Sequence, residues 1–373
     1  MLVSAQPTPN LTPVLDPGVC PRRVVLLTSP DMRERAAWLE AVYRPRGVVT
    51  EQWPISNAWD IEAIQGRVLE FLESEDALAD AGELALNATG GTKPMSIAAY
   101  EVFRDCDCPI YYVHPEEDRL IWMHPSGRPP HALADVVRIP DFVLAHGGCV
   151  QAEEDIRIPP AFRDFTRDMV RDIGYFEKAL GRLNWYASEA RDGLRSPPLE
   201  VAHEFDNAFQ DLLERLDMLG ILRVSDGCIL FADEAARFFA NGGWLEQHVH
   251  AAMNALRGRG IRIQDARRGL QVEWQTGHSR NEIDVAFLVD NRLHVIECKT
   301  RGWAERGAGA DALYRLDSLA DAAGGLQARA MLVSYRRLGK GDVRRARDLG
   351  IEVVQGGQIA EMAARLQRWV KPA

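Results

Sequence analysis

Residues 281–299 (NEIDVAFLVDNRLHVIECK) constrain the fold more than any other stretch of this chain. Apolar residues alternate with other residues through its first half, and a second apolar run begins at Leu293. Alternation with period two is typical of β-strands, and Asp290-Asn291-Arg292 between the two runs has the composition of a short turn. The stretch therefore predicts a β-hairpin.

Three charged residues, Asp284, Glu297 and Lys299, interrupt these apolar strands. Glu297 and Lys299 are two residues apart and share one face of the strand, with Cys298 on the other face. Asp284 can reach the same face if the strands pair as predicted. Burying such charges is costly unless they are paired or hold a metal. Two carboxylates suit a hard divalent cation, and a lysine can stabilise negative charge on phosphorus. A salt-bridged surface hairpin is the alternative.

Asp284, a spacer of twelve residues and then Glu297-Cys298-Lys299 resemble the D...ExK signature of the PD-(D/E)xK nuclease superfamily. The resemblance implies a restriction-endonuclease-like α/β domain at residues 241–373. It implies Mn²⁺ or Mg²⁺ held by Asp284 and Glu297, with Lys299 as a further catalytic residue. It also implies that an acidic residue of the preceding helix joins the site, and Glu246 in GGWLEQHV is the matching candidate.

The N-terminal part alternates apolar strands with amphipathic helices, which predicts a parallel, Rossmann-like sheet. The third expected strand, residues 83–88, leads into Thr89-Gly90-Gly91-Thr92-Lys93 and then a helix. Ligands bind such sheets where glycine-rich turns meet helix N-termini, so this loop is a candidate phosphate site. A purely structural glycine turn is equally compatible with the residues.

The loop NATGGTKPMS resembles the ligand loop of CARF domains, the CRISPR-associated Rossmann folds that sense cyclic oligoadenylates. The exit of the first strand, at Thr28-Ser29-Pro30, matches their other ligand loop. The order of parts resembles the CARF nucleases activated by cyclic tetra-adenylate in type III CRISPR defence. That resemblance implies a homodimer with the cyclic nucleotide across its two-fold axis, and single-stranded DNA or RNA as substrate. The residues expected to bind the activator are Thr28, Ser29, Thr89, Gly90, Gly91, Thr92 and Lys93.

We expect a disordered lead-in at residues 1–20, a sensor at 21–148 and a helix-rich connector at 149–240. The connector has a helix, a turn and a short hairpin in winged-helix order, followed by the nuclease domain. Its acidic composition favours a structural role over a nucleic-acid module. A ligand-sensing transcriptional regulator that uses this unit to read DNA is the alternative function, and slow cleavage of the ligand by the sensor through Lys93 is a third possibility.

Charge is distributed unevenly along the 373 residues, which carry a net charge of −10. Residues 241–373 have 21 Lys and Arg against 15 Asp and Glu, whereas residues 1–240 have 23 against 39. The basic excess therefore coincides with the nuclease-like motif. A basic run from Arg336 to Arg347 could follow a nucleic-acid backbone or could be a solvated helix face. No apolar run approaches a membrane span, and the six scattered cysteines indicate neither disulfides nor zinc, so we expect a cytoplasmic protein.

Overall fold

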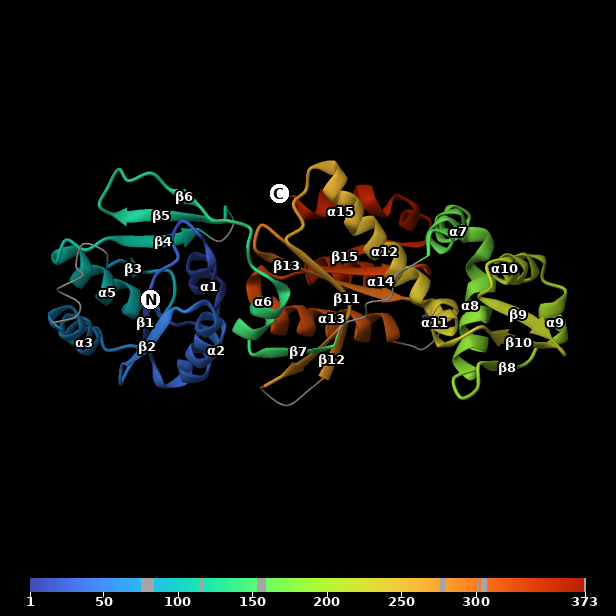
Figure 1. The fold of residues 1–373 in the computed structure, drawn as a ribbon, viewed down its shortest axis with the longest axis horizontal. Helices are drawn as coiled ribbons and strands as arrows, with labels where there is room; N and C mark the ends of the chain where they lie inside the picture. Colours follow the sequence, from blue (N-terminus) through green and yellow to red (C-terminus); the bar gives the residue numbers. More distant parts are fainter. Residues whose placement is uncertain are drawn as a thin grey trace.

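The computed structural model describes residues 1–74, 84–114, 117–152, 159–275, 280–300, 302 and 307–371. Figure 1 shows three units in a row, with the N-terminal unit at one end and the green and yellow unit of residues 159–240 at the other. The nuclease-like unit lies between them. The stretch expected to connect the two domains is therefore a terminal lobe in space. No helix among the described residues is long and apolar enough to span a membrane.

The N-terminal unit pairs β1 (Arg23–Thr28) with β2 (Val49–Pro54) and β3 (Leu86–Asn87) with β4 (Ile110–His114), both in parallel. β5 (Arg119–His124) and β6 (His131–Ala132) then continue the sheet in antiparallel order. The predicted parallel pairing is present in β1–β2 and β3–β4, whereas β5 is antiparallel to β4 because the four residues between them are too few for a crossover. The helices are α1 (Thr8–Leu15), α2 (Arg33–Tyr43), α3 (Ile61–Glu73), α5 (Lys93–Asp105) and α6 (Ile139–Ala145).

Most of residues 1–16 are buried, and Thr8–Leu15 form α1, so the prediction of a disordered lead-in is wrong. Leu2 forms a parallel bridge with Leu27 of β1. Leu11, on α1, is fully buried. The Asn10 amide donates to the Leu2 carbonyl at 2.8 Å, and the Tyr43 hydroxyl donates to the Asn10 carbonyl at 2.8 Å. These bonds satisfy backbone groups in a proline-rich segment whose composition suggests disorder.

The central unit contains a six-stranded sheet in the order β15-β14-β13-β12-β11-β7. Its first four strands in the chain are antiparallel, and β13, β14 and β15 are parallel. The strands are β7 (Gly148–Ala152), β11 (Asp265–Trp274), β12 (Arg280–Val289), β13 (Arg292–Lys299), β14 (Arg329–Ser334) and β15 (Glu352–Gln355). The helices are α12 (Trp244–Asn254), α13 (Ala308–Gly324), α14 (Lys340–Asp348) and α15 (Met362–Val370). The predicted boundary at residue 148 therefore falls at the start of a strand that belongs to this sheet.

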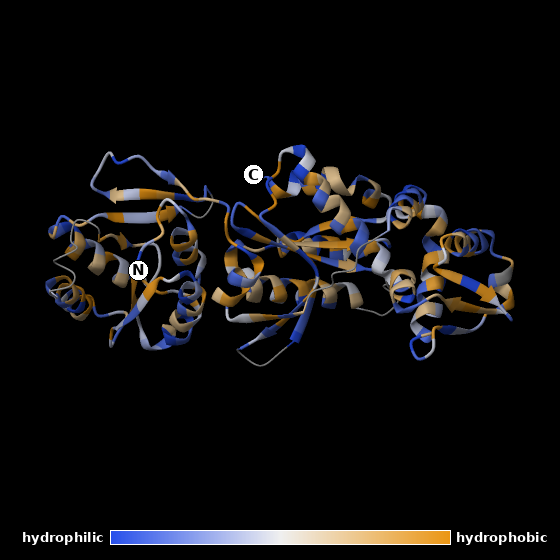
Figure 2. Ribbon diagram, viewed as in Figure 1, coloured by the Kyte–Doolittle hydropathy of each residue, from blue (hydrophilic) through white to orange (hydrophobic). Residues whose placement is uncertain are grey.

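Strand residues alternate between two separate cores, one on each face of the central sheet. In Figure 2 the strands of this sheet show apolar (orange) stretches beside hydrophilic (blue) ones. Phe287 and Cys298 belong to the core that includes residues of α12 and α15. Ala286 and Val295 belong to the core that includes residues of α13, α6 and the sensor helices α1 and α2. The sensor therefore packs against one face of the nuclease-like sheet and shares a continuous core with it.

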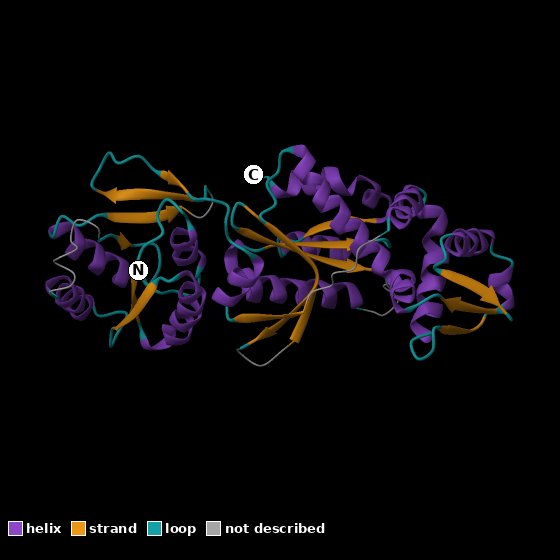
Figure 3. Ribbon diagram, in the orientation of Figure 1, coloured by secondary structure: helices purple, strands orange, loops and turns teal. Residues whose placement is uncertain are grey.

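Residues 159–240 form a winged-helix unit of helices around a three-stranded sheet (Figure 3). Its elements are α7 (Pro160–Arg171), α8 (Ile173–Glu189), β8 (Arg195–Pro198), α9 (Val201–Glu204), α10 (Asn207–Met218), β9 (Leu222–Ser225), β10 (Cys228–Phe231) and α11 (Glu234–Phe238). The sheet order β8-β10-β9 confirms the predicted winged-helix arrangement. Pro197 and Pro198 lie in β8, at the edge of this sheet, a position that tolerates prolines.

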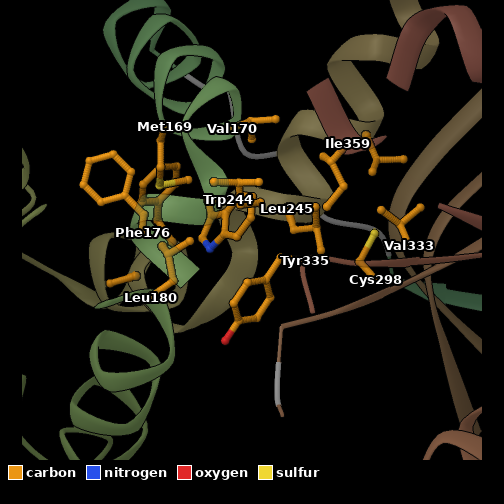
Figure 4. Close-up of a cluster of buried hydrophobic side chains, with 14 of the residues drawn as sticks. Met169, Val170, Phe176, Leu180, Trp244, Leu245, Cys298, Val333, Tyr335 and Ile359 are labelled. Carbon is orange, nitrogen blue, oxygen red and sulfur yellow. The ribbon is translucent and has the colours of Figure 1, made fainter. Parts of the chain in front are cut away.

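Buried side chains join this unit to the nuclease-like sheet (Figure 4). Trp244 of α12 and Tyr335 after β14 lie in the same cluster as Met169 and Phe176 from α7 and α8, and all four are nearly inaccessible to solvent. The Trp244 and Tyr335 rings meet edge to face, with their centroids 6.3 Å apart. The winged-helix unit is thus fixed to the face of the sheet opposite the sensor.

Candidate active site and sensor loop

The predicted hairpin is present and its turn is tighter than expected. Asp290 and Asn291 alone connect β12 to β13, both with positive φ of 50° and 51°. Two such residues form the turn that matches the twist of paired strands. The register aligns Val285 with Ile296 and Val289 with Arg292. It therefore brings Asp284, in the middle of β12, close to Glu297, near the end of β13.

Asp284, Glu297 and Lys299 all lie on the sheet face that the sensor and α13 cover, as strand alternation predicts. Asp284 Oδ2 accepts the backbone N–H of Cys298 at 2.7 Å. Lys299 Nζ contacts Glu297 Oε1 in an ion pair. Asp284 is buried deepest, whereas Glu297 and Lys299 line an open cleft.

The two carboxyl groups and one ammonium group of this site are partly removed from water, and negative charge is in excess there. Burial, followed by the charge of Glu297, raises the pKa of Asp284 to about 8. Burial alone would lower the pKa of Lys299, but the Glu297 carboxylate raises it above its ordinary value. Burial and the charge of Asp284 also raise the pKa of the Cys298 thiol, so this cysteine is an unreactive packing residue.

Glu246 comes from the other side of the sheet. It occupies the first turn of α12, whose apolar side chains pack in the core that contains Cys298. Its charge contributes to the raised pKa of Cys298, which places Glu246 near the end of β13. The approach is close because Gly242, with φ of 113°, precedes α12, and a Cβ there would lie 2.1 Å from Thr300 Oγ1. Glu246 thus lies near Cys298, at the end of β13 that carries Lys299.

The donor set fits a hard divalent cation. The carboxyl groups of Asp284 and Glu297 are close together, and the charge of Glu297 contributes to the raised pKa of Asp284. A bound cation would remove this repulsion. Within the described part of the chain, no three His, Cys, Asp or Glu side chains group closely enough to hold an ion. Water and phosphate oxygens would therefore complete the coordination of a metal held by Asp284 and Glu297.

The cleft beside Glu297 and Lys299 has a volume of about 1190 Å³ and two walls of different origin. One wall is α13, with Tyr314 and Arg315. The other comes from the sensor and includes Gln6, Arg35 and Trp38. The Trp38 indole N–H donates to Gln275 Oε1 at 2.8 Å and ties the sensor wall to the end of β11. The sequence offered no signal for these wall residues, because Trp38 and Gln275 are 237 positions apart.

The predicted sensor loop follows β3 and begins α5, as expected, but most of its hydroxyls already have partners. Thr89 Oγ1 donates to Asn87 Oδ1 at 2.7 Å and accepts the Val113 N–H at 2.7 Å. Thr92 Oγ1 donates to the Ala58 carbonyl at 2.7 Å and caps α5. Lys93 is exposed at the first position of α5.

The residues that follow β1 are more enclosed than the loop. Thr28 is 1% exposed and donates to the Leu26 carbonyl at 2.9 Å. Ser29 is 2% exposed and donates to Asp31 Oδ1 at 2.6 Å. These two hydroxyls therefore shape the first strand exit, and of the predicted side chains Lys93 is the one best placed to meet a ligand.

The N-terminal segment connects this loop to the cleft. A Cβ on Gly90 would lie 2.1 Å from the Leu2 carbonyl oxygen, so the loop backbone rests directly on residue 2. Gly91 has φ of 74° and lies against Leu2 and Met95. Ala5 and Gln6, three and four residues further along, line the cleft beside Glu297 and Lys299. The loop and the cleft are thus separated by a few residues of one extended segment.

Comparisons with known proteins agree with this division of the chain. Residues 1–142 match the Card1 CARF domain family, and residues 233–373 match the Card1-like endonuclease domain family. Among curated protein sequences, none matches the chain.

Three solved structures show the same fold. Protein VC1899 from Vibrio cholerae is 31% identical over 99% of this chain and 96% of its own, with a TM-score of 0.90. Can2 from Sulfobacillus thermosulfidooxidans, solved with cyclic tetra-adenylate, is 25% identical over 99% and 98%, with a TM-score of 0.84. A type III CRISPR defence DNA nuclease activated by cyclic oligoadenylate is 22% identical over 91% of this chain and 45% of its own, with a TM-score of 0.58, and shows the fold alone.

The predicted fold class, a CARF domain followed by a winged-helix unit and an endonuclease domain, is thereby confirmed. The exposed face of α10, which would read DNA in a regulator, carries Asp211, Glu214 and Asp217 and does not favour that alternative. The chain belongs to the Card1-like family, in which a CARF domain is joined to an endonuclease domain.

Proposed function

We propose that this protein is a homodimeric nuclease of type III CRISPR defence, activated by a cyclic oligoadenylate and dependent on Mn²⁺ or Mg²⁺. Single-stranded DNA or RNA is its substrate, cyclic tetra-adenylate its activator and the cytoplasm its location. One observation carries the proposal: Glu297 and Lys299 open into a cleft whose opposite wall is built by the sensor domain.

Asp284 and Glu297 would hold the metal, and Lys299 lies beside them. A bound divalent cation polarises a phosphate oxygen and makes water a better nucleophile. Lys299, whose raised pKa keeps its ammonium charged at neutral pH, donates to a phosphate oxygen and stabilises the charge that develops as water attacks phosphorus. Glu246 supports the site from the start of α12.

Activation depends on residues 2–6, which lie between the loop that contains Gly90 and the wall of the cleft. A cyclic oligoadenylate would place its phosphates near Lys93 and the N-terminus of α5, where positive charge and the helix dipole favour anions. Movement of the loop would be transmitted through Leu2 to the cleft wall. A ligand shifts such an equilibrium only if it binds the active form more tightly than the inactive form.

Nuclease assays on labelled single-stranded and duplex DNA and RNA test this function, with and without cyclic tetra-adenylate and with Mn²⁺, Mg²⁺ or chelator. We expect cleavage of single strands that needs both activator and metal, and its loss in Glu297→Gln and Lys299→Ala. Cleavage at the parent rate in both variants would place the active site elsewhere. Calorimetry should show one cyclic tetra-adenylate per dimer, and absence of heat with every cyclic oligoadenylate would refute the sensor assignment.

A further inference from the structure

A second groove, with a volume of about 320 Å³, lies on α8 of the winged-helix unit. Three of its lining residues, Lys178, Arg182 and Trp185, follow one another at helical spacing and form one exposed face of the helix. Trp185 is 46% exposed, and its ring meets Tyr186 edge to face with the centroids 4.8 Å apart. An exposed aromatic ring that lies beside basic side chains can stack on a planar ligand.

Arg336 connects this groove to the catalytic cleft. Its side chain lines the groove, and its guanidinium lies between two glycines: a Cβ on Gly181 would be 2.3 Å from Nη2, and a Cβ on Gly302 would be 2.8 Å from Nη1. Gly302 lines the cleft that contains Glu297. The Asn184 amide also donates to the Thr300 carbonyl at 2.8 Å, which fixes α8 to the chain just beyond Lys299. The two depressions therefore meet at Arg336.

The groove has positive charge available for a ligand. Among the described residues, Lys178 and Arg336 form no ion pair with a carboxylate, whereas Arg182 is paired with Asp206. The one carboxylate that lines the groove, Glu200, lies 3.7 Å from His203 Nε2 at the rim. Cationic side chains beside an exposed aromatic ring are the combination by which proteins hold single-stranded nucleic acids, since each base offers a face for stacking.

We propose that this groove binds the single strand as it leaves the catalytic cleft, with a base stacked on Trp185 and phosphates contacting Lys178 and Arg336. The inference rests on the proposed nuclease function and adds a binding subsite to it. It assigns the α8 face of the winged-helix unit, and not the acidic helix α10, to nucleic acid. The strand would run from Lys299 past Arg336 to Trp185.

The test measures the affinity of a labelled oligothymidine for full-length Glu297→Gln protein, with cyclic tetra-adenylate bound, by fluorescence anisotropy. In this background Trp185→Ala should weaken binding by roughly tenfold or more, and Trp185→Tyr should retain most of the affinity. Lys178→Ala and Arg336→Ala should each lower the slope of log Kd against log salt by about 0.7, the value for one phosphate contact on a single strand. A merely structural role would leave that slope unchanged.

Two matched variants serve as controls: Tyr175→Ala removes an exposed ring from the start of α8, and Arg223→Ala removes a cation from the wing strand β9. Both should bind as tightly as the parent. If Trp185→Ala does so too, or if Arg223→Ala loses as much affinity as Lys178→Ala, the groove is not the subsite. If the parent cleaves single strands and Trp185→Ala binds them as tightly as the parent, the groove assignment is wrong and the proposed function stands. Activated parent that neither binds nor cleaves single strands would overturn the proposed function with it.

Discussion

Cys298 donates its backbone N–H to the Asp284 carboxylate at 2.7 Å, which ties the middle of β12 to the end of β13 where the pairing of these two strands stops. The bond fixes one carboxylate oxygen while the carboxyl stays beside Glu297. Because Cys298 itself faces the opposite core, the carboxylate is anchored by the backbone and not by a side chain that could rotate. This anchoring makes Asp284 the most rigid member of the proposed site.

Asp284→Asn should abolish activator-dependent cleavage and leave the fold intact. The amide oxygen can still accept the Cys298 N–H, but the negative charge for a metal is gone. Thermal unfolding with added Mn²⁺ tests this directly: the parent should gain melting temperature with the ion, as any ligand of the native state provides, and the variant should gain less. An equal gain in both proteins would show that Asp284 is not a ligand.

Stability at the junction between sensor and nuclease should depend on pH through Asp118. Its side chain accepts the Asn291 amide at 2.7 Å, and burial raises its pKa to about 7. A carboxyl with a raised pKa contributes stability that is complete below its unfolded pKa and is lost as pH rises through the folded pKa.

Asp118→Asn keeps the neutral form at every pH. Its free energy of unfolding relative to the parent should therefore rise between about pH 4 and pH 7 and then level off. Denaturant unfolding at a series of pH values measures the difference. A difference that is constant across this range would contradict the assigned pKa.

Gly90→Ala should weaken both the fold and the response to activator. The new Cβ would meet the Leu2 carbonyl at 2.1 Å and displace the segment that continues to the cleft wall. Such overpacking costs about 1–3 kcal/mol. Gly66→Ala is the control, since that glycine lies on an exposed face of α3 with no atom near its Cβ position, and it should stabilise by up to about 1 kcal/mol. Melting temperatures measure the effect of each variant on the fold, and calorimetric titration with cyclic tetra-adenylate measures its effect on the response to activator.

Gly242→Ala should reduce cleavage more than any other glycine substitution near the site. The residue has φ of 113°, and its Cβ would lie 2.1 Å from Thr300 Oγ1. Accommodating it would separate α12, which carries Glu246, from the end of β13, at a cost of about 1–3 kcal/mol. Gly258→Ala, with nothing within 4 Å, should cleave normally. Full activity in Gly242→Ala would mean that the position of α12 is unimportant for catalysis.

The hairpin, and the face of the sheet on which each of its side chains lies, were predictable because they depend on period-two alternation. The strand, turn and helix around the sensor loop were predictable because glycine precedes the start of a helix. Glu297 and Lys299 share a face because they are two positions apart in a strand, where side chains alternate between the two faces. The catalytic roles of Glu246, Asp284, Glu297 and Lys299, and the ligand-binding roles of the sensor residues, remain predictions. The proline-rich start was mispredicted, because burial by a distant partner such as Tyr43 outweighed its composition.

The cleft, by contrast, could not be predicted from sequence patterns. Trp38 reaches it from a sensor helix, and Arg336 reaches the α8 groove from the loop after β14, so both sites arise from long-range packing. β11 was missed for a related reason: its residues Ala266, Arg267 and Arg268 break the apolar alternation, and the segment becomes a strand through pairing with β12 and β7. Local patterns identify elements, whereas shared cavities depend on how those elements meet.

The position of β7 bears on how such a protein could evolve. This strand follows the sensor helix α6 in the chain and yet forms the edge of the nuclease sheet beside β11. A recombination event that joined the nuclease to another sensor after Gly148 would leave the edge of β11 without its partner and open to pairing with other chains. A cassette that keeps this edge covered would therefore have to include β7, which lies upstream of the endonuclease-domain match at residues 233–373.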